Sequence, residues 1–239
     1  MSATSPTTAQ GYRQGLRAGL PFVLLILPFA AVFGIIATEA GLTLAETLGF
    51  SVMVIAGASQ LAAVQLMIDG APFAVVLLTA LAVNLRMAMY SASLAPHLGR
   101  ASLGARAAVA YLMVDQAYAM AFLQFERAPD WSVGAKLGYY FGVVTPVAPT
   151  WYLGTALGGI AGHRLPEGLP LDYVVPITFL SLVGSMLRTW AHAVAALVSA
   201  GAALLLLGLP WNLGLPLAGL LAMSAGALVE AQSNRRRQG

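Results

Sequence analysis

The chain has 239 residues, of which 59% are hydrophobic and only 9% charged, and its formal net charge is +3. Ordinary soluble domains carry about 25% charged residues, and a soluble fold of this size cannot hide so much apolar surface from water. The composition therefore excludes a soluble domain and predicts an integral membrane protein. The absence of cysteine excludes disulfides, thiolate metal sites and a cysteine nucleophile.

Eight apolar segments follow one another along the chain, between a Ser-, Thr-, Ala- and Pro-rich tail and a basic tail. Their residues do not alternate at period two, so they predict helices, and a bilayer core of about 30 Å requires about 20 helical residues. We therefore predict an all-α fold with a disordered tail at 1–10, one membrane domain at 11–230 and a cytoplasmic tail at 231–239. The segments are 18–38, 47–68, 71–94, 107–125, 137–162, 173–187 and the run 189–229, which a turn at 208–212 divides in two.

Arginines gather at four places, which the positive-inside rule assigns to the cytoplasm. If all eight segments crossed the membrane, the first two clusters would lie on opposite sides of it. If segments 47–68 and 173–187 are instead re-entrant, entering and leaving on one side, six crossings remain and all four clusters lie in the cytoplasm. This arrangement places both termini in the cytoplasm. It also predicts an inverted repeat with broken helices, a recurring plan in secondary transporters, in which segments 18–38 and 137–162 run in opposite directions; chance similarity between apolar helices is the alternative. The clusters are Arg13/Arg17, Arg100/Arg106, Arg164 and Arg235/Arg236/Arg237.

Asp115 lies near the middle of segment 107–125, and helical spacing places Tyr111, Tyr118 and Phe122 on the same face as Asp115. A charge at membrane depth costs about 2.5–3.5 kcal/mol on insertion scales, so it marks a function or a structural pair. A carboxylate shielded from water takes up a proton more readily, which makes Asp115 the candidate for proton coupling. A permanent ion pair with Arg86 is the alternative.

Asn84, Arg86 and Tyr90 are candidate substrate-binding residues, and the last two lie one helical turn apart. The planar guanidinium of arginine suits a substrate carboxylate, because it donates two parallel hydrogen bonds. The alternative for Arg86 is that its long side chain reaches the membrane interface.

The middle of segment 47–68 is small and polar, which predicts a break in the helix. Free backbone amides at the start of a half-helix can hold an anionic group. Close packing through small residues is the alternative. The candidate substrate-binding residues here are Gly57, Ala58, Ser59 and Gln60.

Signatures of an enzyme are lacking. The three histidines lie far apart without the spacing of metal ligands, and no glycine-rich nucleotide-binding loop is found. We therefore predict no enzymatic activity, no cofactor and no metal site.

Five motifs stand out along the chain: Gly19-Leu20-Pro21 with Phe33-Gly34, Ala56-Gly57-Ala58-Ser59-Gln60, Asn84-Leu85-Arg86 with Tyr90 and Ser93-Leu94, Asp115 with Tyr118, and Tyr152-Leu153-Gly154. Together they resemble the AzlC family, the large subunits of branched-chain amino-acid exporters, over about residues 11–230. The resemblance implies amino-acid export and a small AzlD-like partner subunit with a few helices. Two positions depart from the family pattern, since Met87 stands where the family often has histidine and Gln116 where it often has glutamate.

The leading hypothesis is a secondary-transporter subunit in the cytoplasmic membrane. It would export branched-chain or similar small neutral amino acids and be driven by an ion or proton gradient. One alternative is a channel, which should show a continuous polar path. Another is a structural membrane subunit whose partner carries the substrate site.

Overall fold

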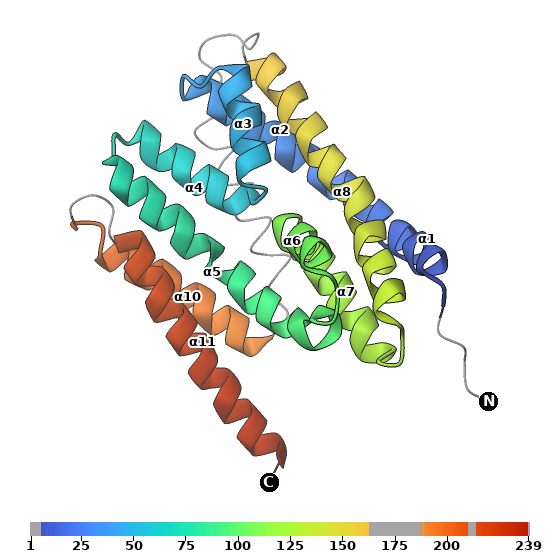
Figure 1. Cartoon of the computed structure of the whole chain (residues 1–239). Helices are drawn as coiled ribbons and strands as arrows, with labels where there is room; N and C mark the ends of the chain where they lie inside the picture. Colours follow the sequence, from blue (N-terminus) through green and yellow to red (C-terminus); the bar gives the residue numbers. More distant parts are fainter. Residues whose placement is uncertain (1–5, 163–186, 188, 210–213, 239) are drawn as a thin grey trace. The chain divides into compact units, whose positions relative to one another are not determined.

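The computed structural model describes residues 6–162, 187, 189–209 and 214–238, and every regular element within them is a helix (Figure 1). The chain divides into two compact units, Met1–Val64 with Val83–Glu167 and Gln65–Ala82 with Gly168–Gly239. The predicted all-α fold is confirmed for the described residues. Most of segment 173–187 lies outside them.

The first unit contains α1 (Thr8–Gly19), η1 (Leu20–Phe22), α2 (Val23–Glu39), α3 (Leu44–Met53), α6 (Leu103–Tyr111), α7 (Asp115–Arg127) and α8 (Val133–Gly162). Helices α4 (Gly57–Ile68) and α5 (Phe73–Leu98) have residues in both units. A capping box between Thr7 and Gln10 starts α1 at Thr8, three residues inside the predicted disordered tail.

The long helix formed by α1, η1 and α2 packs along α8 through glycines. A Cβ at Gly15 would collide with the backbone of Tyr139, and one at Gly34 with the backbone of Thr155. Because residue numbers rise together along both helices, α1–α2 and α8 are parallel (Figure 1). The predicted opposite directions of segments 18–38 and 137–162 are therefore wrong, and Gly162 lies at the same end of the unit as Thr38.

The reason for this error is that segment 107–125 is not one crossing helix. It is broken between α6 and α7, where Val114 is extended with φ −121° and ψ 157°. A short turn joins the end of α5 to the start of α6. Glu126, near the end of α7, then contacts His97 near the end of α5. Segment 107–125 thus begins and ends at the same end of the first unit. It forms a hairpin of two half-helices and not a single crossing helix.

Four helix ends meet at that end of the first unit, which we call the N-terminal end: the starts of α1 and α8 and the ends of α5 and α7. Gly11 lies against Ala135, and the rings of Phe125 and Tyr139 are in contact, with centroids 6.4 Å apart. Of the first two arginine clusters, Arg13/Arg17 lie in α1 and Arg100/Arg106 lie just after α5 and within α6, whereas Arg164 lies outside the described residues. Their place on the cytoplasmic side stays a prediction.

The second break, between α3 and α4, falls directly before Gly57, and there the chain turns sharply (Figure 1). The Gln60 side chain reaches back to the Ser51 hydroxyl at 3.0 Å, which a straight helix would not allow. The predicted broken helix at segment 47–68 is confirmed. Gly57–Gln60 form the first turn of α4, however, and not the bend itself.

Two tyrosine hydroxyls donate hydrogen bonds to backbone carbonyls that the helix breaks leave without an N–H partner. Tyr111 donates to the Val52 carbonyl at 2.6 Å, and Tyr140 donates to those of Val109 and Leu112 at 3.0 and 3.1 Å. Such carbonyls must find donors within the protein when lipid replaces water. The two tyrosines therefore allow both breaks to lie away from water.

The second unit contains α10 (Trp190–Leu205) and α11 (Gly214–Gln238), which pack together where Gly226 meets Ala195. Helix α11 continues to Gln238 through most of the predicted tail at 231–239. The turn at 208–212 was correctly placed between two helices, although residues 210–212 lie outside the described ranges.

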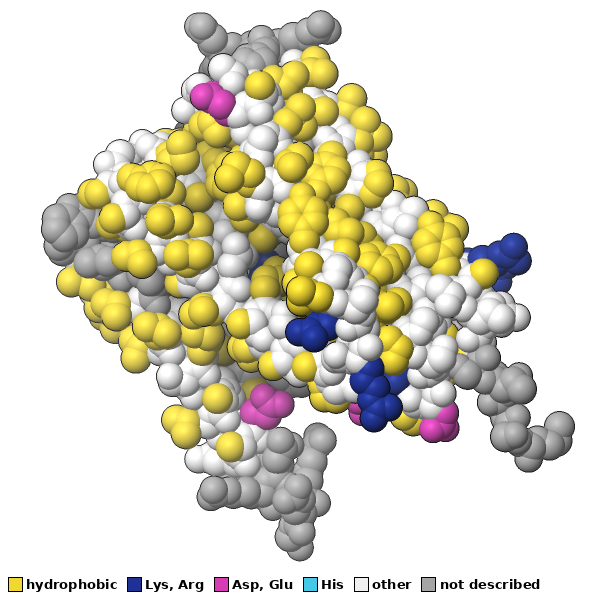
Figure 2. Space-filling model, in the orientation of Figure 1, with side chains coloured by type: hydrophobic (Ala, Val, Ile, Leu, Met, Phe, Trp, Pro, Cys, Tyr) yellow, Lys and Arg dark blue, Asp and Glu magenta, His cyan; other side chains and the backbone are white. Residues whose placement is uncertain are grey.

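Within the described residues, Thr8–Glu39 and Phe73–Leu98 are long and apolar enough to cross a membrane. Hydrophobic side chains dominate the described surface that faces the viewer in Figure 2. Several large ones are more than three-quarters exposed, including Leu24, Met53, Phe73 and Leu205. Such a surface suits lipid, while the number of crossings stays a prediction.

Candidate functional site

Three of the predicted site residues meet where α5 passes the start of α7. Arg86 Nη1 lies 3.2 Å from Asp115 Oδ2, and the Tyr90 hydroxyl donates to Asp115 Oδ1 at 3.0 Å. Because Arg86 and Tyr90 are one turn apart on α5, both reach the same carboxylate. The structure therefore brings together the predicted carboxylate-binding arginine and the predicted proton-coupling acid.

Asp115 is the first residue of α7 and not the middle of one long helix, as its place in the sequence suggested. The free N–H groups at a helix start favour a negative charge there. Tyr111 is on α6, so the predicted face shared by Tyr111 and Asp115 does not exist. Tyr118 does follow Asp115 by one turn, and its ring stacks on Tyr90 with centroids 3.9 Å apart.

The Arg86–Asp115 pair is shielded only in part. The side chains retain 25% and 37% of their full exposure, and Arg86 Nε is buried without a hydrogen-bond partner among the described residues. Asp115 is thus paired through a single short contact between charged groups. The guanidinium keeps a donor that a second carboxylate could use.

A second group of predicted residues surrounds the break before α4. The Asn84 amide donates to the Ser59 hydroxyl at 3.2 Å, and the Asn84 Oδ1 atom is buried without a partner in the described part of the chain. Ser59 and Gln60 are fully buried. Asn84 therefore links α5 to the first turn of α4, two residues before Arg86.

Gln60 belongs to a buried polar network with two residues that the sequence analysis did not single out. With its amide nitrogen 3.1 Å from the Val54 carbonyl, its oxygen accepts from the Ser51 hydroxyl at 3.0 Å. Ser51 also lies 3.3 Å from the Thr155 hydroxyl of α8. Gln60 thus joins α4 to Ser51 of α3, and Ser51 continues the network to α8. Small polar residues within apolar segments were the signal that could have revealed Ser51 and Thr155.

Gly57 is explained by packing. A Cβ there would lie 2.5 Å from the ring of buried Trp151 and 2.7 Å from the ring of half-buried Phe29, so a larger residue would displace both aromatic side chains. Ala58 is partly exposed beside it. The indole Nε1 of Trp151 is buried and has no hydrogen-bond partner among the described residues. Its ring also stacks on Phe33 with centroids 6.1 Å apart, and no sequence prediction had singled it out.

The arrangement thus contains an ion pair with a spare donor and a neighbouring polar helix start, both reached from α5. Such groups can bind a small molecule that carries opposite charges, and a carboxylate that is released from its arginine can exchange a proton. The described residues contain no group of three or more His, Cys, Asp or Glu side chains that could hold a metal ion.

Comparisons with known proteins point to one family. A family model described as "AzlC protein" matches residues 21–165. The chain is 29% identical over 243 residues to the "Inner membrane protein YgaZ" of Escherichia coli, covering 97% of this chain and 96% of the relative. It is 30% identical over 200 residues to an "Uncharacterized membrane protein" of Archaeoglobus fulgidus, covering 80% and 82%. No solved structure matches the chain.

Proposed function

Because this chain belongs to the AzlC family, we propose that it is the large subunit of a secondary transporter that exports branched-chain or similar small neutral amino acids. The relatives named as membrane proteins support a place in the cytoplasmic membrane. An ion or proton gradient would drive the export, and both termini would lie in the cytoplasm. A small AzlD-like helical subunit would be its partner.

The contact between Arg86 and Asp115 carries this proposal. An amino acid has a carboxylate that can replace Asp115 at the guanidinium, and an ammonium group that can pair with a carboxylate. The Asp115 contact at 3.2 Å uses Nη1, so a substrate carboxylate can take the Nη1–Nη2 edge of the guanidinium from Asp115. The Nε atom, which has no partner among the described residues, lies on the other edge. Binding would therefore exchange an internal ion pair for one between Arg86 and the substrate.

The same exchange supplies a means of coupling. Once the substrate takes Arg86, the Asp115 carboxylate has lost its cation and takes up a proton more readily. Tyr90 stays within hydrogen-bond distance of it in either charge state, since a phenol can donate or accept. Substrate binding and the protonation of Asp115 would then be linked.

The broken helices support a transporter over a channel. Both breaks place a half-helix start in the first unit, at Gly57 and at Asp115, and such starts bind substrates in many secondary transporters. The channel alternative requires a continuous polar path, and the alternative of a structural subunit requires that this chain make no contact with substrate.

Efflux measurements test the proposal. Cells loaded with labelled valine, leucine, isoleucine or methionine should lose label faster when this chain and its small partner are both present than with the partner alone. Asp115→Asn keeps the shape of the side chain but cannot titrate, so gradient-driven efflux should stop while substrate binding remains. Efflux that collapses with the proton gradient excludes a channel, and unchanged export by Asp115→Asn would remove Asp115 from the mechanism.

Tyr12→Phe is a matched control for these variants. It removes one hydroxyl that lies 3.0 Å from Thr145 Oγ1 at the α1–α8 interface, away from the ion pair. Its efflux should equal that of the unaltered chain. If Arg86→Met binds substrate as the unaltered chain does, the site lies on the partner and the structural-subunit alternative holds.

A further inference from the structure

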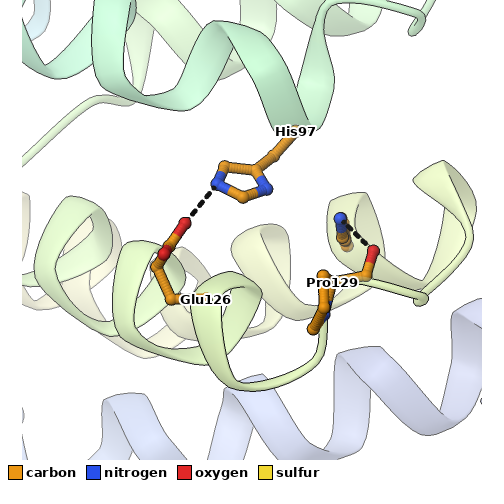
Figure 3. A network of polar contacts seen from close by, with 4 residues as sticks. His97, Glu126 and Pro129 are labelled. Carbon is orange, nitrogen blue, oxygen red and sulfur yellow. Dashed lines mark hydrogen bonds and ion pairs between the residues drawn. The ribbon is translucent and has the colours of Figure 1, made fainter.

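A second polar contact between side chains joins α5 to α7 beyond the proposed site. His97 Nε2 lies 3.1 Å from Glu126 Oε1, and Figure 3 shows the two side chains pointing toward each other. Along each helix this pair lies about three turns, or about 16 Å, from the Arg86–Asp115 pair. The two helices are therefore parallel and are joined at both ends of a shared face.

Aromatic rings fill the face between the two pairs. The ring of Tyr90 stacks on Tyr118 at 3.9 Å, Tyr118 on Phe122 at 5.7 Å, and Phe122 meets His97 edge-on at 6.5 Å. We call these four residues the aromatic seam. Leu94, which shares the face of α5 between Tyr90 and His97, retains only 2% of its exposure. The seam thus separates the Arg86–Asp115 pair from the N-terminal end of the unit by packed rings.

The end of α7 is fixed to α8 as well as to α5. The Lys136 ammonium donates to the Pro129 carbonyl at 2.9 Å and lies 5.7 Å from the centre of the Phe125 ring. These contacts hold the end of α7 without His97. The His97–Glu126 contact is different, because Glu126 is 59% exposed and can leave His97 without burying a charge.

We propose that the aromatic seam closes the Arg86–Asp115 site toward the N-terminal end, and that the His97–Glu126 pair is the latch of this closure. This inference rests on the proposed function, since an exporter must load its substrate from the cytoplasm. The arginines that flank the N-terminal end assign that end to the cytoplasm. Loading therefore requires the seam to part, and the latch is the contact that α5 and α7 must release first.

The absence of native cysteine allows a direct test with one introduced thiol. Leu94→Cys reports on the seam, and a membrane-impermeant maleimide is applied to inverted vesicles, whose cytoplasmic face is outside. Glu126→Ala breaks the latch, and Arg127→Ala is the matched control at the next position of α7. We expect Glu126→Ala to speed the labelling by about tenfold, the factor for losing one hydrogen bond to a charged group, and Arg127→Ala to leave it unchanged.

A second reporter separates opening of the seam from general loosening of the fold. Leu61→Cys on α4 has 1% exposure and lies off the seam, so its labelling should not change in Glu126→Ala. Equal labelling of Leu94→Cys with and without Glu126, or a rise at both reporters, would overturn the closure. Amino-acid efflux from the same cells decides the proposed function separately, because the labelling rate does not depend on which substrate is carried.

Discussion

Neutralising both members of the Arg86–Asp115 pair should separate its structural role from its part in transport. Three variants are compared: Asp115→Asn, Arg86→Met and the double variant. Each single change leaves one charge without its partner, whereas the double change leaves none. A permanent structural pair and a pair that opens for substrate therefore predict different results for the double variant.

The size of the single-variant effect follows from the burial of the pair. Removing one partner of a fully buried pair costs about 3–5 kcal/mol, and exposed pairs contribute about 0–1 kcal/mol. The side chains here retain 25% and 37% of their exposure, which lies between these limits. We therefore expect a loss of about 2 kcal/mol, or about thirtyfold in the ratio of folded to unfolded protein.

The assay has two readouts on the same purified or vesicle-embedded protein. The fraction that stays monodisperse after heating in detergent reports stability, and efflux of labelled amino acid reports transport. We expect the double variant to regain most of the stability that each single variant loses, but to remain inactive. Recovery of gradient-driven efflux in the double variant would refute the reasoning, because neither substrate binding by Arg86 nor proton uptake by Asp115 would then be needed.

Two further predictions concern the packing of the first unit. The chain has no native cysteine, so introduced cysteines can report which helix ends are close. Cysteines that replace Thr8 and Gly134 should cross-link at one end of the α1–α2 and α8 pair, and those that replace Thr38 and Gly162 should cross-link at the other end. Positions 8 and 162 are about 45 Å apart in parallel helices, so a cross-link between them would contradict the parallel arrangement. Gly57→Leu should lower the yield of folded protein together with transport, because its side chain would collide with the rings of Trp151 and Phe29. Normal yield with selective loss of substrate binding would instead place that position at the substrate.

Several properties could be predicted from the sequence because they depend on local composition. The low charge content predicted the membrane class, and the long apolar runs predicted helices. The small and polar stretch before Gln60 indicated a broken helix, which the structure places between α3 and α4. Arg86 and Tyr90 share a face of α5 because of their spacing, and this too is a local property.

Only the tertiary structure decided which of these local features meet. The spacing of apolar residues does not distinguish a crossing helix from two half-helices that return to the same side, so the direction of α8 was predicted wrongly. Whether Arg86 and Asp115 form an ion pair could not be decided from the sequence, and the structure shows that their side chains are in contact. The His97–Glu126 pair was not foreseen, because each residue lies at the end of a different helix. Such contacts depend on how α5 and α7 are aligned, and that alignment is fixed by the break before Asp115 and by the packing of α7 on α8.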